Sequence, residues 1–106
     1  MLFMKYVYPA IFTPVGNDEF DVKIPDLPGC RTCGNGLADA IFMAEDAMSM
    51  WLWDAESKSE TIPTPTPAPI VNLPQFTNYI VADTDEYRKK YAAHSVMVSP
   101  MPSYHR

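Results

Sequence analysis

The sequence is short of cysteine, glycine and basic residues. Its 106 residues hold two cysteines and four glycines, and eight Lys and Arg stand against thirteen Asp and Glu, for a net charge of −5 at pH 7. Two cysteines do not form the disulfide framework that stabilises small secreted domains, so we expect a chain that folds in the reducing cytoplasm. Binding to a phosphate backbone needs clustered Lys and Arg, so the charge balance argues against nucleic acid as a partner.

Long hydrophobic runs are also missing. No segment approaches the roughly 20 apolar residues that span a bilayer, and the apolar start, residues 1–4, is too short for a signal peptide. We therefore predict no membrane association. Hydrophobic residues still make up 47% of the chain, enough for a packed core, and the length suits one domain. The acidic excess favours association with a basic partner.

The first third of the chain has the pattern of a β-hairpin. Residues 4–13 are rich in aromatic and β-branched side chains, which favours a strand. Pro9 cannot donate a ladder hydrogen bond, so we expect it at an edge or a bulge. Turn residues at 15–18 lead to an alternating segment, 19–24, which predicts a half-buried strand antiparallel to the first.

A rigid turn and a long helix follow. Two prolines and a glycine in Pro25–Gly29 predict an irregular connection, after which Cys30–Cys33 is suited to a short third strand. Asn35 is a candidate N-cap for a helix from about 36 to 56. Apolar side chains recur on one face of this helix: Leu37, Ala40, Ile41, Ala44, Ala47, Met48, Trp51 and Leu52. Phe42, Met43, Met50 and Trp53 widen that face, so we expect another protomer or a partner to cover the excess.

The remainder predicts an extended linker and two smaller elements. Residues 57–75 carry proline at every second position from 63 to 69, which favours a polyproline-like return to the sheet. We expect the last core strand at 78–82, a short helix at 86–91 and a short strand at 95–99. The whole reads as an α+β fold of two layers, with an antiparallel sheet of three to four strands packed on one long helix.

No constellation of residues in the sequence points to catalysis. Cys30 and Cys33 have the spacing of half a zinc site, but the two histidines, His94 and His105, lie far away without ligand spacing. The acids near residues 18–26 are clustered in sequence, and nothing forces them to converge on a metal ion. We therefore expect no enzyme activity, no cofactor and no metal.

Four segments carry a resemblance to a known family. MKYVYPAIF (4–12) followed by FDVKIPDLPGC (20–30), with GNGLADA (34–40) and the tryptophan-containing MWLWD (50–54), resembles the N-terminal domain of the HicB antitoxins. The resemblance implies a reduced ribonuclease-H-like fold (order β-β-β-α-β, then a short helix) that lacks the catalytic acids. It further implies binding to a HicA-type toxin, a small basic ribonuclease that cleaves mRNA, and formation of a homodimer or higher oligomer.

The resemblance also suggests how the chain is divided. It places the toxin-neutralising domain at 4–92 and a C-terminal tail at 93–106, which is similar to the start of a DNA-binding domain. Expected toxin contacts are the acids and the rigid turn: Asp18, Glu19, Asp21, Asp26, Leu27, Pro28 and Gly29. Phe42, Met50 and Trp53 are expected to form an oligomer or partner surface.

The alternatives belong to other functional classes. One is a nucleic-acid-binding transcriptional regulator of the chain's own operon, as in relatives with a DNA-binding domain. Another is a metal-dependent nuclease, suggested by the relation to ribonuclease H. A third is an oligomerisation domain that has no toxin partner. Each differs from the antitoxin in what it binds, so a binding or turnover measurement separates them.

Overall fold

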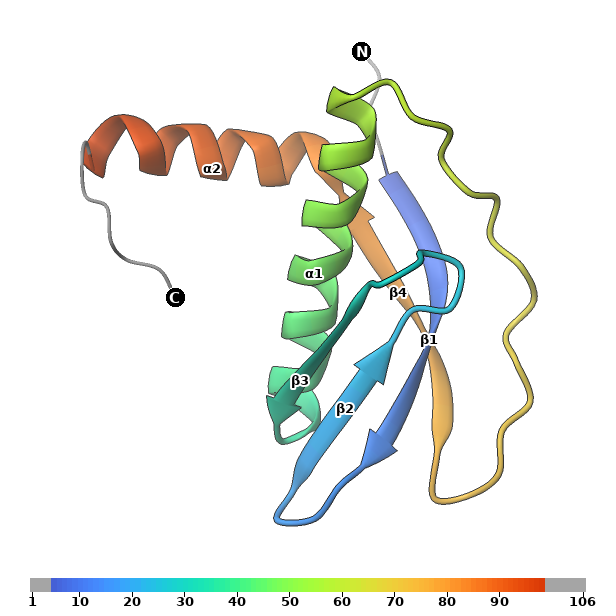
Figure 1. Cartoon of the computed structure of the whole chain (residues 1–106). Helices are drawn as coiled ribbons and strands as arrows, with labels where there is room; N and C mark the ends of the chain where they lie inside the picture. Colours follow the sequence, from blue (N-terminus) through green and yellow to red (C-terminus); the bar gives the residue numbers. More distant parts are fainter. Residues whose placement is uncertain (1–4, 99–106) are drawn as a thin grey trace.

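The computed structural model describes residues 5–98 and shows one sheet, one long helix and a second helix that extends away from both (Figure 1). The elements in chain order are β1 (Lys5–Pro14), β2 (Glu19–Lys23), β3 (Arg31–Asn35), α1 (Leu37–Ser57), β4 (Phe76–Asp83) and α2 (Thr84–Val98). This order confirms the predicted α+β architecture, β-β-β-α-β followed by a helix.

The sheet is antiparallel throughout, with strand order β3-β2-β1-β4. Register places Phe12 opposite Val22 and Tyr8 opposite Ile80, so aromatic and aliphatic side chains of three strands share one face. Pro9 pairs with Tyr79 of β4, whereas pairing between β1 and β2 starts only at Ile11. The proline therefore lies where β1 has no neighbour on its other side, as its missing N–H requires.

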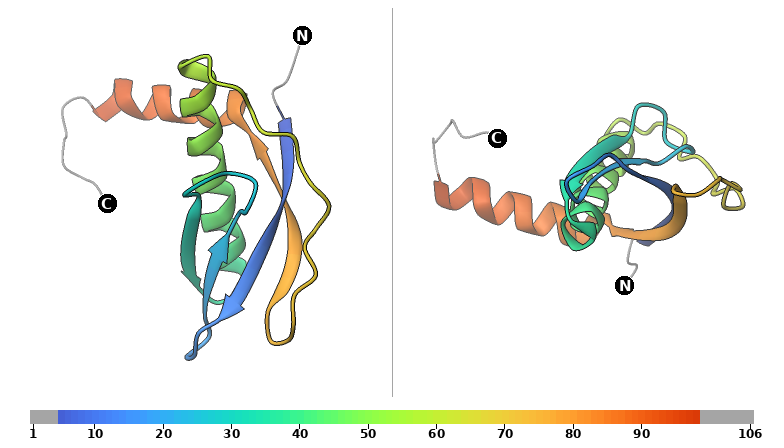
Figure 2. Two further views of the ribbon diagram at one scale, coloured as in Figure 1. Left: turned by 45° about the vertical axis from the view of Figure 1, so that its right-hand side comes forward. Right: turned by 90° about the horizontal axis from the view of Figure 1, so that it is seen from below.

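The core forms where α1 packs across this face of the curved sheet (Figure 2). Its largest fully buried side chains include Tyr8, Phe12, Met48 and Leu52. Small residues allow close approach, since a Cβ built on Gly34 of β3 would lie 2.5 Å from the Cα of Ala40 on α1. The following buried residues complete the core: Ala10, Val22, Ile24, Leu27, Cys30, Ala40, Ala44, Ile80 and Ala82.

The start of α1 differs from the prediction. Asn35 is the last residue of β3 and Gly36, at φ 89°, occupies the N-cap, so the expected capping by Asn35 is wrong. The Asn35 N–H instead donates to Asp39 Oδ2 at 2.9 Å. Leu37 was expected on the buried face but is 43% exposed.

The proline-rich linker runs extended alongside the sheet, as predicted, and is fastened to the domain at several points (Figure 1). The Tyr8 hydroxyl donates to the carbonyl of Pro63, and Ile62 packs against the core. Both carboxylate oxygens of Asp26 accept hydrogen bonds from Thr66. These contacts make the linker part of the folded unit.

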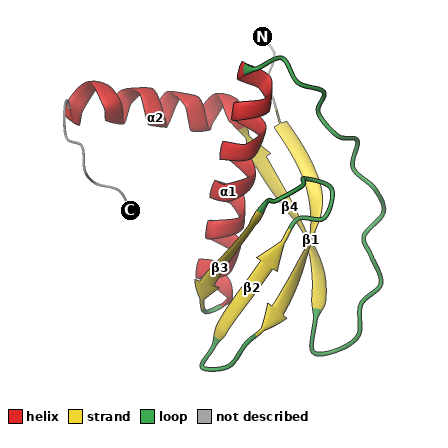
Figure 3. Cartoon of the chain, viewed as in Figure 1, coloured by secondary structure: helices red, strands yellow, loops and turns green. Residues whose placement is uncertain are grey.

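The last described element is one helix, where the sequence predicted a short helix and then a strand at 95–99. α2 continues from Thr84 to Val98 (Figure 3), so the strand prediction is wrong. Asp83 Oδ1 accepts the Glu86 N–H at 3.0 Å and caps the helix, and no proline interrupts it before position 100. The predicted division between 92 and 93 falls inside this helix, and positions 99–106 of the predicted tail lie outside the described residues. Among the described helices, none is both long and apolar enough to cross a membrane.

Candidate functional site

The rigid turn that was expected to meet the toxin is built largely to face inward. Hydrogen bonds from Leu27 N to Ile24 O (3.0 Å) and from Cys30 N to Leu27 O (2.9 Å) close the turn on itself. Leu27 is 1% exposed, so the structure corrects its expected role: its side chain anchors the turn in the core. The carbonyl of Pro28 accepts the Trp51 Nε1–H at 2.9 Å. Pro28 and Gly29 remain exposed at the tip.

The expected acidic contacts do not form one cluster. Asp18 and Glu19 are exposed at the β1–β2 turn, where the Asp18 carbonyl accepts the Gly36 N–H at 2.6 Å. Asp21 is exposed on the outer face of the sheet, opposite Cys33. The turn that contains Asp26 lies at the other end of β2, roughly 17 Å away for a five-residue strand. The predicted toxin contacts are therefore spread along β2, with Asp18 and Glu19 at one end, Asp21 in the middle and the turn that contains Asp26 beyond the other end.

The three residues expected to form an oligomer or partner surface have different environments. Phe42 and Met50 are 55% and 54% exposed on α1. Trp53 packs against the rings of Tyr87 and Tyr91, with ring centroids 5.7 and 5.2 Å apart. α2 of the same chain thus covers Trp53, and this part of the wide apolar face needs no second protein.

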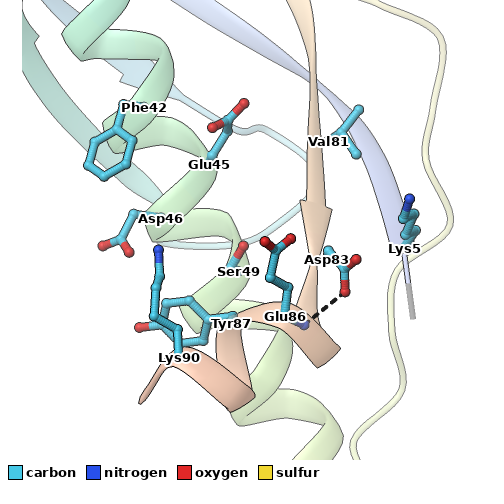
Figure 4. Close-up of a pocket in the computed structure, with 10 residues that line it drawn as sticks. All are labelled: Lys5, Phe42, Glu45, Asp46, Ser49, Val81, Asp83, Glu86, Tyr87 and Lys90. Carbon is cyan, nitrogen blue, oxygen red and sulfur yellow. Dashed lines mark hydrogen bonds between the residues drawn. The ribbon is translucent and has the colours of Figure 1, made fainter. Parts of the chain in front are cut away.

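A groove lies between α1, the free edge of β4 and the first turns of α2 (Figure 4). Its volume is about 360 Å³. Helix α1 contributes Phe42, Glu45, Asp46 and Ser49, the strands contribute Lys5, Val81 and Asp83, and α2 contributes Glu86, Tyr87 and Lys90. Phe42, Asp46 and Ser49 are spaced four and three residues apart, so one stripe of the helix faces the groove.

The groove carries an excess of negative charge. Four carboxylates and two ammonium groups line it, and Glu45, Asp46 and Glu86 form no ion pair with any described residue. Burial raises the pKa of the Tyr87 phenol, and the nearby Asp46 carboxylate raises it further. The groove therefore favours a cationic ligand.

The two cysteines differ in how deeply they are buried. Cys30 lies in the core, where burial raises the pKa of its thiol to about 11, so the reactive thiolate is scarce at neutral pH. Cys33 is exposed on the outer sheet face. Among the residues whose side chains the structure describes, 5–91, no three His, Cys, Asp or Glu side chains gather closely enough to hold a metal ion.

Sequence reasoning missed the groove because its lining comes from four separate elements, β1, α1, β4 and α2. Ser49, Asp83 and Glu86 were not among the residues predicted to form a site. One feature of the sequence could have pointed to the groove. Ser49 is polar, although it lies seven residues after Phe42 and next to the apolar stripe of α1. A polar residue buried on such a stripe marks a position where something other than packing is needed.

The architecture is that of a small α+β binding domain, and the comparisons identify its family. Residues 8–101 match the family described as HicB_like antitoxin of bacterial toxin–antitoxin systems, and the chain belongs to that family. A 14.9 kDa protein from the rep–hol intergenic region of Haemophilus phage HP1 (strain HP1c1) is 31% identical over 82 residues. That match covers 74% of this chain and 59% of the length of the phage protein.

Solved structures with the same fold come from toxin–antitoxin systems. An antitoxin-containing complex from Streptococcus pneumoniae superposes with a TM-score of 0.70 at 17% identity, over 97% of this chain and 81% of that one. A HicA3–HicB3 complex gives 0.58 at 23% identity, over 74% and 99% of the two chains. The N-terminal domain of HicB from Burkholderia pseudomallei gives 0.57 at 18% identity, over 71% and 95%. At these identities the likeness concerns the fold.

Proposed function

We propose that this chain is the antitoxin of a type II toxin–antitoxin pair, which binds a HicA-type mRNA-cleaving toxin in the cytoplasm and masks its active site. It acts by binding and performs no catalysis of its own. Membership of the HicB_like antitoxin family is the observation that carries the proposal. The acidic character of the chain, −5 overall, supports it, because a ribonuclease that binds RNA needs a basic surface.

Charge would act mainly on the rate of encounter. Asp18, Glu19 and Asp21 are exposed and form no ion pair with described residues, so their field reaches solvent. Complementary fields steer a basic partner into place and raise the association rate, an effect that salt screens. We therefore expect association with the toxin to slow markedly as ionic strength rises.

Apolar contacts would hold the complex or an oligomer together. Phe42 and Met50 expose more than half of their side-chain area on α1, and Pro28 and Gly29 form a rigid tip. Large, exposed apolar side chains become energetic hot spots when a partner excludes water from them. Self-association into a homodimer or higher oligomer through Phe42 and Met50 is part of the same proposal.

Co-expression with a HicA-type toxin tests the proposal directly. We expect the chain to restore growth, to co-purify with the toxin and to suppress cleavage of an RNA substrate at one antitoxin per toxin. The double variant Glu19→Gln/Asp21→Asn should slow association, whereas Asp54→Asn/Glu60→Gln, with the same change in net charge, should have a smaller effect. Absence of both rescue and complex formation would refute the proposal.

A further inference from the structure

Ser49 provides a polar group at the floor of the acidic groove that nothing in the described chain satisfies. The residue is 7% exposed, and no described residue forms a hydrogen bond with its hydroxyl. Fully enclosed polar side-chain atoms within residues 5–91 all have partners, so the Ser49 hydroxyl opens into the groove. A hydroxyl that no protein group satisfies keeps its donor and its acceptor lone pairs free for a molecule in the groove. The floor of the groove therefore favours a ligand that hydrogen-bonds there.

Two carboxylates flank this hydroxyl from different elements. Glu45 lies one turn before Ser49 on α1, and Glu86 projects from the start of α2 (Figure 4). Neither carboxylate forms an ion pair with a described residue. The two lysines that line the groove, Lys5 and Lys90, lie toward its two sides in Figure 4, with Ser49 and Glu86 between them. The centre of the groove thus remains negative.

The positions of these polar groups determine which kind of cation the groove can bind. Within the described residues no three acidic, histidine or cysteine side chains converge on a point, so a compact metal ion would find too few ligands. A guanidinium group is planar and carries five N–H donors directed to several sides. Its apolar stem has a matching surface in Val81, which is 54% exposed on the β4 edge.

We propose that the groove receives an arginine side chain from a basic partner protein, with the guanidinium between Glu45 and Glu86 and donating to the Ser49 hydroxyl. This inference rests on the proposed function, in which the partner is the toxin. It deepens that function by assigning a specific anchor to α1, β4 and α2, away from the acids at the two ends of β2. The remaining acids then serve encounter, and the groove slows dissociation.

The first experiment needs no toxin. N-acetyl-arginine amide is titrated into the full ¹⁵N-labelled chain, with N-acetyl-citrulline amide as the uncharged analogue of the same shape. We expect saturable amide shifts centred on Ser49 and Glu86 with the arginine probe and much weaker ones with citrulline. Equal shifts with both probes, or no saturable shift in the groove, would overturn the inference.

The second experiment measures affinity for a HicA-type toxin by titration calorimetry. Glu45→Gln/Glu86→Gln should weaken binding about tenfold or more, since hydrogen bonds to charged groups are strong, and Ser49→Ala should weaken it about threefold. Asp54→Asn/Glu60→Gln is the control with equal net charge. Thermal unfolding of each variant verifies that it folds.

The outcomes separate the two proposals. If the toxin binds the unaltered chain and both groove variants equally well, the arginine anchor is wrong and the antitoxin function stands. If the toxin does not bind the unaltered chain, the proposed function fails. The arginine titration then still tests whether the groove binds an arginine side chain, because its result does not depend on the toxin.

Discussion

The Thr66 hydroxyl donates to Asp26 Oδ1 at 2.7 Å, and the Thr66 N–H donates to Asp26 Oδ2 at 2.9 Å. These residues are forty positions apart in sequence. The pair joins the proline-rich linker to the turn between β2 and β3, so a carboxylate that was expected to meet a partner protein already accepts two hydrogen bonds from Thr66 of the same chain. Its primary role in the fold is to hold the linker against the core.

Replacing Asp26 should loosen the linker. Asp26→Asn retains an acceptor for the Thr66 hydroxyl but loses the one for its N–H, and we expect a loss of about 1 kcal/mol in the free energy of unfolding, since both bonds are exposed to solvent. Urea unfolding measures this, and limited proteolysis between 61 and 75 should accelerate. Thr66→Val, which loses only the hydroxyl bond, is the matched control. Unchanged proteolysis of both variants would show that the bonds do not restrain the linker.

Gly34→Ala should be among the most damaging small substitutions in this chain. The added Cβ would lie 2.5 Å from both the Cα and the N of Ala40, so backbone would have to move, and we expect a loss of about 3 kcal/mol or more. Gly16→Ala is the comparison, because Gly16 has a φ of 95° with no atom near its Cβ position and should lose only about 1–2 kcal/mol. Chemical unfolding ranks the two. The reverse order would contradict the close contact between β3 and α1.

Trp53→Ala should release α2 from α1. The indole contacts the rings of Tyr87 and Tyr91, and each aromatic pair contributes about 0.5–1.5 kcal/mol. We expect faster hydrogen exchange of the α2 amides with little change in the sheet. Met50→Ala, on the exposed side of α1, should change stability by less than about 0.5 kcal/mol. Equal exchange in α2 for both variants would rule out the packing role of Trp53.

The two cysteines should react at very different rates. At pH 8 a thiol reagent should label Cys33 quickly, because it is exposed, and Cys30 only as the chain unfolds. Burial raises the folded-state pKa of Cys30 from an ordinary 9.0 to about 11, because the neutral thiol is favoured. That contribution to stability is complete below pH 9 and is lost as pH rises from 9 to 11.

Cys30→Ala provides the control for this pH dependence. Burial also raises the pKa values of Tyr6 and Tyr8 above 10.0, so both proteins should lose stability at still higher pH. Only the unaltered chain should begin to lose stability near pH 9. Chemical unfolding at pH 8, 9.5 and 10.5 measures the difference. Identical profiles would mean that the thiol is not held neutral by burial.

Much of the fold could be predicted from local pattern. The alternation of Phe20, Val22 and Ile24 established a half-buried strand, and Pro9 identified a place where β1 lacks a neighbour. The spacing of Ala40, Ala44 and Met48 established the buried face of α1. These features follow from the periods of strand and helix, which depend on residues close in sequence.

The secondary-structure predictions were wrong where the local residue preferences do not determine the structure. Asn35 has the side chain of an N-cap, but pairing with Glu19 retains it in β3 and leaves the cap to Gly36. The segment 95–99 contains the β-branched Val96 and Val98 and was predicted as a strand, but the helix that begins at Thr84 continues to Val98. Strand pairing therefore overrode the N-cap preference of Asn35. The continuing helix α2 overrode the strand propensity of the two valines.

The candidate site depended still more on tertiary structure. The sequence showed which residues are acidic, and its net negative charge indicated a basic partner. Whether those acids act together was not visible, because Asp18 and Asp26 lie at opposite ends of β2. Likewise, the sequence left Trp53 available to another protein, whereas α2 covers it within the chain.

The amino-acid sequence by itself determined the class of fold, the family resemblance and the acidic character, because composition, periodicity and turn chemistry are local properties. Only the tertiary structure decided which polar groups share a surface. Ser49 and Glu86 are 37 positions apart in sequence and reach the same groove because α2 turns back across α1 after β4. Proximity of this kind arises from packing between elements, which no local pattern encodes.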